Sequence, residues 1–169
     1  MENPTGLLLV DKPAGWTSHD VVAKVRRLLN SRKVGHAGTL DPMATGLLVL
    51  GVGGATKLLT YLVGADKTYL ATIRLGAATV TDDAESDYLH QASPTELELI
   101  DRPQIEAAIA KLRGTIEQIP SSVSAIKVAG RRAYDLVRAG QDVELKSRSV
   151  TISRFELINE PVRVGANKF

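Results

Sequence analysis

A single aspartate inside a glycine-rich loop is the feature of this sequence that most restricts its fold. It lies in residues 32–50, which read RKVGHAGTLDPMATGLLVL. The three glycines of this stretch let the backbone approach other backbone or a ligand closely, because no Cβ intervenes. Asp41 precedes Pro42, which favours extended or turn geometry at the aspartate. The apolar run 47–50 predicts a short strand buried on both faces, so one acid is held on a loop at the edge of a core.

The length and the charge distribution suit a single domain with a polyanion-binding face. The chain has 169 residues, 44% of them hydrophobic, and a net charge of only +2. Lysines and arginines outnumber acids by six to three in residues 1–40 and by eight to four in 111–148, whereas 82–106 hold eight acids and one arginine. Two basic segments separated by an acidic one fit a surface that binds a polyanion. Solvated charge on ordinary surface helices explains the same pattern.

Several kinds of site and segment are disfavoured by the composition. The chain has no cysteine, which excludes disulfides and thiolate metal sites. Its three histidines, at 19, 36 and 90, do not have metal-ligand spacing. The apolar residues 6–10 are too few for a signal-peptide core, and no run approaches the ~20 residues that span a bilayer. We therefore expect a cytoplasmic protein with no membrane segment and no bound metal.

Hydrophobic periodicity and turn residues predict a mixed α+β domain. The predicted strands cover residues 6–10, 47–50, 67–76, 115–119, 123–128 and 148–158. The predicted helices cover 19–29 with Ser18 as N-cap, 56–63, a segment that begins after Asp101, and 131–139. Alternation in 67–76 places Tyr69 on the same face as three apolar residues, which taken alone indicates a core tyrosine. We expect a mainly antiparallel sheet with flanking helices.

Asp41 is the candidate for catalysis because it is the only acid in residues 21–65. An aspartate before proline more often forms a turn. With Arg32, Lys33 and His36 upstream, however, a carboxylate on a fixed loop is able to stay ionised and act as nucleophile or base. A two-carboxylate glycosidase requires a second acid a few ångströms away, and nothing in the sequence places one.

Other side chains have two interpretations each. His36 is either a loop histidine bonded to backbone or a ring that stacks on an unpaired base. Tyr69 is either a core residue or an aromatic at the mouth of a pocket. The acids of residues 82–87 resemble a calcium loop in composition only, because their spacing does not match an EF-hand. The arginines of the predicted helix 131–139 fit phosphate contacts and an ordinary basic surface equally well.

Four blocks of the sequence resemble the TruB family of tRNA pseudouridine-55 synthases. They are DKPAGWTSHDVV at 11–22, GHAGTLDPMATGLLVLGVGGATKLL at 35–59, DKTYLATIRLG at 66–76 and SAIKVAGRRAYDLVRAG at 124–140. The second block contains the G-x-L-D core that pseudouridine synthases share more loosely. The blocks follow the family's order and extend to about residue 157. The resemblance implies the pseudouridine synthase fold over 1–169, with an RNA-gripping insertion at about 117–145.

The resemblance implies an enzyme that isomerises a uridine in the T-loop of tRNA. The N-glycosidic bond breaks and the base is rejoined through carbon, with no metal or organic cofactor. Asp41 matches the catalytic aspartate, Tyr69 the tyrosine that stacks on the target uracil, and His36 the histidine that occupies the space left in the T-loop. Flipping a base out of a folded loop costs a few kcal/mol. The stacking tyrosine and the inserted histidine would offset that cost.

The same resemblance assigns roles to residues further along the chain. It implies that Asp83 pairs with an active-site arginine, and that Lys127, Arg131 and Arg132 bind the RNA substrate. The family continues past the strand at 148–158 into a motif resembling C-S-x-G-T-Y-I-R, and then into a C-terminal RNA-binding region. Residues 160–169, EPVRVGANKF, do not match that motif. We therefore expect the N-terminal portion of the catalytic domain, with the C-terminal part of the fold and the C-terminal domain absent.

Three functions remain as hypotheses at this point. The first is a tRNA-modifying enzyme that binds the T-arm as a monomer. The second is an RNA-binding or RNA-folding module that keeps the grip on the T-loop without turnover in this chain. The third, a carboxylate hydrolase of sugars, predicts cleavage of simple glycosides and no affinity for RNA, and it is disfavoured because no second acid is placed beside Asp41.

Overall fold

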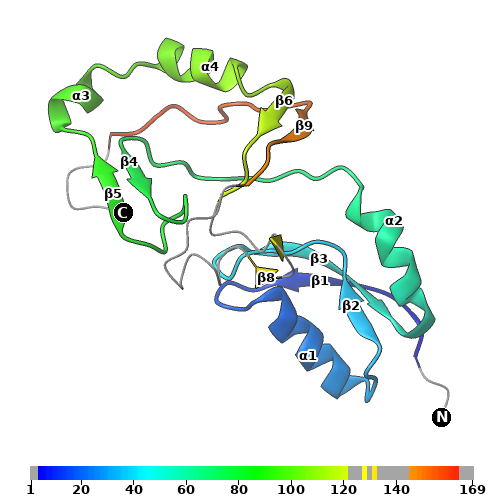
Figure 1. The fold of residues 1–169 in the computed structure, drawn as a ribbon. Helices are drawn as coiled ribbons and strands as arrows, with labels where there is room; N and C mark the ends of the chain where they lie inside the picture. The colour runs from blue at the N-terminus through cyan, green and yellow to red at the C-terminus, as the bar shows by residue number, and fades with distance from the viewer. Residues whose placement is uncertain (1–3, 122–126, 129–130, 133–144, 164–169) are drawn as a thin grey trace. The chain divides into compact units, whose positions relative to one another are not determined.

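The computed structural model describes residues 4–121, 127–128, 131–132 and 145–163 (Figure 1). The chain divides into two compact units, Met1–Ala71 and Thr72–Phe169. All the strand pairs that the structure describes within these units are antiparallel. Helices and antiparallel strands together confirm the predicted α+β class. The assignment of 1–169 to one catalytic domain stays a prediction.

A three-stranded antiparallel sheet forms the centre of the first unit (Figure 1). Its strand order is β1 (Gly6–Lys12), β3 (Gly46–Val52) and β2 (Val34–His36). The strand predicted over 6–10 is confirmed and continues to Lys12. Because the register pairs Lys12 with Gly46, the end of β1 lies beside the start of β3. The loop that carries Asp41 enters β3 at this point.

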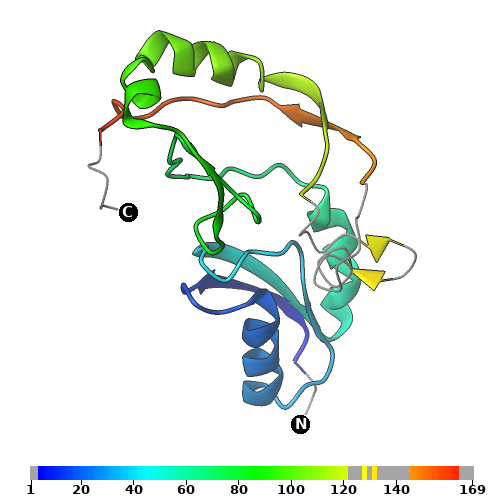
Figure 2. The same ribbon diagram turned by 60° about the vertical axis from the view of Figure 1, so that its left-hand side comes forward.

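Helix α1 (Ser18–Leu28) covers one face of this sheet, as the views in Figures 1 and 2 agree. The core between them is made of valines and leucines: Val21, Val22, Val25, Val34, Leu48, Leu50 and Val52. The three core residues of β3 are every second residue, as a strand with one buried face requires. Leu47, on the other face, is 65% exposed. The prediction that this run is buried on both faces was therefore wrong.

Helix α1 begins one residue earlier than the sequence predicted. Its N-cap is Thr17, whose Oγ1 accepts the Asp20 amide at 3.0 Å, while the Asp20 carboxylate accepts the Thr17 amide at 2.9 Å. This reciprocal pair is a capping box, which satisfies backbone donors that the first turn leaves unpaired. Ser18, the predicted N-cap, is instead the first helical residue, and its hydroxyl serves another segment.

The segment after β3 packs on the sheet face opposite α1. It consists of the 3-10 helix η1 (Gly53–Leu58) and helix α2 (Leu59–Val63), so the single helix predicted over 56–63 is divided in two. A Cβ on Gly51 would lie 3.0 Å from Leu59 Cγ and 2.9 Å from the Ala55 carbonyl oxygen. Gly51 alternates with the core residues of β3, so this close approach is on the other face.

The strand predicted over 67–76 does not form. Residues 67–74 belong to no helix or strand, and none of the strands that the structure describes pairs with them. A strand needs a hydrogen-bonded neighbour, which alternation in the sequence cannot supply. Tyr69 is 68% exposed, so its interpretation as a core residue was also wrong.

The described residues of the second unit form short helices and three two-stranded antiparallel pairs. β4 (Ala77–Thr79) pairs with β5 (Tyr88–Gln91), β6 (Gly114–Gln118) with β9 (Arg148–Ile152), and β7 (Lys127–Val128) with β8 (Arg131–Arg132). Between β5 and β6 lie α3 (Pro94–Glu98) and α4 (Arg102–Ala110), the second capped by Asp101 as predicted. Capping boxes begin both helices.

The predictions for this unit have mixed outcomes. β6 confirms the strand predicted over 115–119, whereas the strand predicted over 148–158 ends at Ile152. The helix predicted over 131–139 is wrong at its first two residues, because Arg131 and Arg132 pair with β7 in a strand. Residues 133–139, and 123–126 of another predicted strand, lie outside the described residues.

Candidate functional site

Asp41 lies on the loop that joins β2 to β3 in the first unit (Figure 1). Its side chain is exposed, and among the described residues its carboxylate makes no hydrogen bond or ion pair. Its backbone carbonyl accepts the Ala44 amide at 3.0 Å, which closes a tight turn. The acid therefore faces solvent on an ordered turn.

Ser18 holds the residue before Asp41 by both of its backbone polar groups. The Ser18 hydroxyl accepts the Leu40 amide at 2.9 Å and donates to the Leu40 carbonyl at 3.2 Å. The Ser18 side chain is only 2% exposed, so water does not compete for these two hydrogen bonds. Leu40 also packs against the valine and leucine core.

Lys12 and Gly15 hold the residue after Asp41. Lys12 is fully buried, and its Nζ donates to the carbonyls of Trp16 at 2.7 Å, Pro13 at 3.1 Å and Pro42 at 3.2 Å. An ammonium group has three donors, so all of them are satisfied. The Pro42 carbonyl also accepts the Gly15 amide at 2.8 Å. Because Leu40 and Pro42 are both anchored, the position of Asp41 between them is fixed.

His36 is half-buried at the end of β2, on the strand that leads into this loop. Its Nδ1 lies 2.5 Å from the Gly38 carbonyl. Because a carbonyl oxygen only accepts, Nδ1 carries the proton, which leaves Nε2 as an acceptor in the neutral ring. The His19 and His36 rings pack edge to face, with centroids 5.4 Å apart and planes at 81°.

The segment that carries Tyr69 passes beside the same loop. A Cβ on Gly38, whose φ is +101°, would lie 3.8 Å from Lys67 Cε. The Lys67 ammonium donates to the carbonyls of Val63 at 2.8 Å and Ala65 at 2.9 Å, just after α2. Tyr69 follows two residues later with an exposed ring. Among the described residues, no hydrogen bond or ring contact joins Tyr69 to His36 or Asp41.

The candidates of the second unit are held by local contacts. The half-buried Asp83 accepts the Thr81 hydroxyl at 2.5 Å and the Glu85 amide at 2.9 Å through the same carboxylate oxygen. The Thr79 hydroxyl donates to the Asp83 carbonyl at 2.7 Å. These bonds fold the acidic segment back on itself, and within the described residues Asp83 has no arginine partner.

The basic candidates of the insertion lie on the β7–β8 pair. The register places Lys127 opposite Arg132 and Val128 opposite Arg131. Three of the four residues of this strand pair are thus cationic. In the predicted insertion, residues 122–126, 129–130 and 133–144 lie outside the described residues.

Three residues of the site were not assigned their roles from the sequence. Lys12 and Ser18 were placed in a turn and at a helix start, yet they anchor a loop 30 and 22 residues away. His19 contacts the His36 ring. No periodicity or turn signal reports contacts over such separations. The one sequence feature that Lys12, Ser18 and His19 share is that they belong to the block at 11–22.

Two kinds of site are not found in the part of the chain that the structure describes. There, no group of three or more His, Cys, Asp or Glu side chains is arranged to hold a metal ion. No described helix has the length and apolar character needed to cross a membrane.

Comparison with known proteins gives a family match over most of the chain. Residues 26–164 match the family described as TruB family pseudouridylate synthase, N-terminal domain. The chain is 63% identical over 156 residues to a tRNA pseudouridine synthase B of Leifsonia xyli subsp. xyli, and 60% identical over 163 residues to one of Arthrobacter sp. strain FB24. These alignments cover 92% and 96% of the chain.

The chain spans about half the length of the curated relatives it matches, 52% in both of these cases. A crystal structure of a Cbf5-Nop10-Gar1 complex is 28% identical with a TM-score of 0.46, over 72% of this chain and 31% of that one.

Proposed function

This chain belongs to the TruB family of pseudouridylate synthases, and on that basis we propose that its protein converts the uridine at position 55 in the T-loop of tRNA to pseudouridine. In this isomerisation the bond from N1 of uracil to C1′ of ribose breaks, and a bond from C5 to C1′ forms. C5 releases its proton and N1 gains one. The reaction therefore consumes no second substrate.

The observation that supports this proposal is that Asp41 has an exposed carboxylate on a backbone that is held on both sides. Its carboxylate has no partner among the described residues, while Leu40 and Pro42 on either side are held by Ser18, Lys12 and Gly15. A group held in position before the substrate arrives does not pay the entropy of ordering during the reaction. The exposed carboxylate would attack C1′ as a nucleophile or take the C2′ proton as a base.

His36 and Tyr69 would handle the base that has to leave the T-loop. Extruding a base costs a few kcal/mol, and stacking on an aromatic ring returns about 1–3 kcal/mol. The exposed ring of Tyr69 is available for such stacking. The His36 ring is held by Gly38 and His19, so it would occupy the space that the flipped base leaves in the T-loop without first having to be ordered.

Binding of the T-arm would draw on residues of the second unit. The strand pair β7–β8 carries Lys127, Arg131 and Arg132, which would contact RNA phosphates. Asp83 would pair with an arginine of the active site. We also propose a monomer that acts in the cytoplasm, where tRNA is modified.

The test is release of tritium from a tRNA transcript labelled at C5 of uridine. We expect release by the wild-type protein and none by Asp41→Asn, whose affinity for tRNA stays within about tenfold, or 1.4 kcal/mol. Glu98→Gln, which removes an exposed carboxylate of α3, is the matched control and keeps the parent rate. Comparable turnover by Asp41→Asn would overturn the assignment. Binding of tRNA by the wild-type protein without release would instead favour the RNA-binding module.

A further inference from the structure

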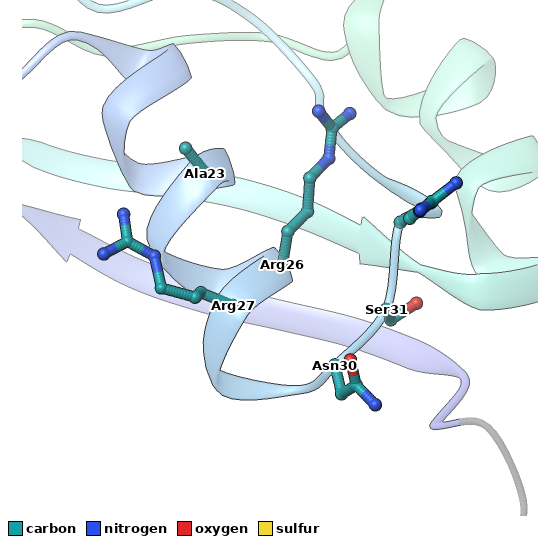
Figure 3. A pocket seen from close by; sticks show the side chains of 6 residues that line it. Ala23, Arg26, Arg27, Asn30 and Ser31 are labelled. Atoms are coloured by element: carbon teal, nitrogen blue, oxygen red, sulfur yellow. The ribbon is translucent and has the colours of Figure 1, made fainter.

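An open surface depression lies at the C-terminal end of α1. No residue of the Asp41 loop lines it. It has a volume of about 480 Å³ and is lined by Ala23, Arg26, Arg27, Asn30, Ser31 and Arg32. In Figure 3, Arg26 and Arg27 leave the helix in different directions, and Asn30 and Ser31 follow on the loop that ends it. We call these six residues the α1 basic surface.

The charge of this region has one sign. Residues 23–33, AKVRRLLNSRK, contain five lysines and arginines and no acid. A second depression on the same helix is lined by Gly15, Trp16, Asp20, Ala23, Lys24 and Arg27. The carboxylate in it, Asp20, is engaged by Thr17 in the capping box. Arg27 lines both depressions, so it lies at the centre of the basic region.

The three arginines of the α1 basic surface differ in whether their side chains bond to other parts of the fold. Arg26 donates through Nη2 to the Val34 carbonyl at 2.7 Å and so ties α1 to β2. Arg27 and Arg32 are exposed, and within the described residues neither makes an ion pair or a side-chain hydrogen bond. The helix dipole favours Arg27 in the last turn of α1, but Arg32 lies beyond the helix and has no such benefit.

We propose that the α1 basic surface binds the phosphate backbone of the RNA substrate, outside the loop that holds the target uridine. The inference rests on the proposed function, because it assigns a second contact to the same substrate. The forked guanidinium groups of Arg27 and Arg32 match phosphate oxygens, and Asn30 and Ser31 add uncharged donors. The lining contains no aromatic ring on which a base could stack. The contact is therefore independent of base sequence.

The test compares the salt dependence of tRNA binding in single-charge variants. Each arginine that contacts a phosphate contributes about one unit to the slope of log K against log salt concentration. Arg27→Gln and Arg32→Gln should each lower that slope by about one and raise Kd at low salt. Because Arg27 lies on α1 and outside the Asp41 loop, Arg27→Gln should raise KM for tRNA while kcat at saturating tRNA stays at the parent value.

Lys57→Gln is the matched control. Lys57 is an exposed cation of η1 in the same unit, and η1 packs on the sheet face opposite α1. Equal slopes for Arg27→Gln, Arg32→Gln and Lys57→Gln would overturn the inference. Thermal midpoints measured alongside show that each variant is folded. A wild-type protein that binds tRNA but releases no tritium would defeat the proposed enzyme activity, while the slopes would still decide the role of this surface.

Discussion

The Ser18 hydroxyl and the backbone of Leu40 satisfy each other completely, with one hydrogen bond in each direction at 2.9 and 3.2 Å. Ser18 opens α1, and Leu40 precedes Asp41. The relationship couples the start of a core-packed helix to the backbone of the candidate catalytic residue. Since Ser18 is buried and bonds both polar groups of the Leu40 backbone, a shift of α1 would move the Asp41 loop with it.

Removing this hydroxyl should impair both stability and turnover. Ser18→Ala leaves the amide and carbonyl of the half-buried Leu40 without their side-chain partner, which costs about 1–3 kcal/mol for each group that water cannot reach. We expect a lower free energy of unfolding in urea and a fall in kcat of tenfold or more, because a small displacement of a catalytic group is costly. Affinity for tRNA should change less than kcat.

Thr60→Ala is the control for this prediction, since it removes an exposed hydroxyl that bonds only within its own helical turn. It should leave both the unfolding free energy and kcat near the parent values. If Ser18→Ala were destabilised but retained full kcat, the hydroxyl would serve the fold without positioning Asp41.

The buried ammonium of Lys12 should be among the most sensitive positions of the first unit. Lys12→Met keeps an apolar stem of similar length but withdraws the donor from the carbonyls of Pro13, Trp16 and Pro42. The carbonyls of Pro13 and Trp16 would then lose their side-chain donor, at about 1–3 kcal/mol for each that water cannot reach, while the Pro42 carbonyl would keep the Gly15 amide. We expect the urea midpoint to fall by more than in Ser18→Ala. An unchanged midpoint would show that water replaces the ammonium.

The sequence was sufficient for the elements whose signals are local. The apolar runs at 6–10 and 47–50 predicted strands, which are found as β1 and β3, although the burial predicted for the second was wrong. Asp101 before Pro103 marked the start of α4. The strand prediction for 67–76 was wrong because no described strand pairs with this segment. Alternation within one segment does not determine which strand, if any, it pairs with.

In the candidate site, too, the sequence predicted the local features and missed the contacts between distant segments. Asp41 was predicted to lie on a loop at the edge of the core, because Pro42 favours extended or turn geometry at the aspartate and the nearby glycines allow a close approach of the backbone. Its supports were not predicted, since a buried lysine that bonds only carbonyls has no sequence signature. Lys12 reads as an ordinary turn residue before Pro13, yet it is fully buried. Contacts between distant segments had to be observed.

The start of α1 should lose stability in acid. The Thr17 hydroxyl at 2.6 Å, and then the Thr17 amide at 2.9 Å, hold the pKa of Asp20 below its ordinary value. A carboxyl whose pKa is lower in the folded state stabilises that state above its unfolded pKa of about 3.9, and the contribution is lost as the pH falls through the folded pKa. Asp20→Asn should therefore lower the thermal midpoint at neutral pH.

The difference in midpoint between wild type and Asp20→Asn should shrink below about pH 4 and disappear once Asp20 is protonated. The comparison is needed because Glu96, whose pKa is also lowered by hydrogen bonds from the Ser93 amide and hydroxyl, adds a pH dependence of its own. Glu98→Gln removes an exposed carboxylate without such bonds and should show no comparable difference. A difference for Asp20→Asn that is constant with pH would contradict the assignment.

Tyr69 should affect turnover without affecting stability. Its ring is 68% exposed, so Tyr69→Ala removes little packing and the urea midpoint should stay near the parent value. Loss of stacking on a flipped base, worth about 1–3 kcal/mol, should reduce kcat/KM roughly fivefold to 150-fold. Tyr69→Phe keeps the ring and should retain most of that stacking. Tyr61→Ala, which removes an 81% exposed tyrosine of α2 in the same unit, is the matched control. Equal kcat/KM values for Tyr69→Ala and Tyr61→Ala would mean that the Tyr69 ring does not meet the substrate.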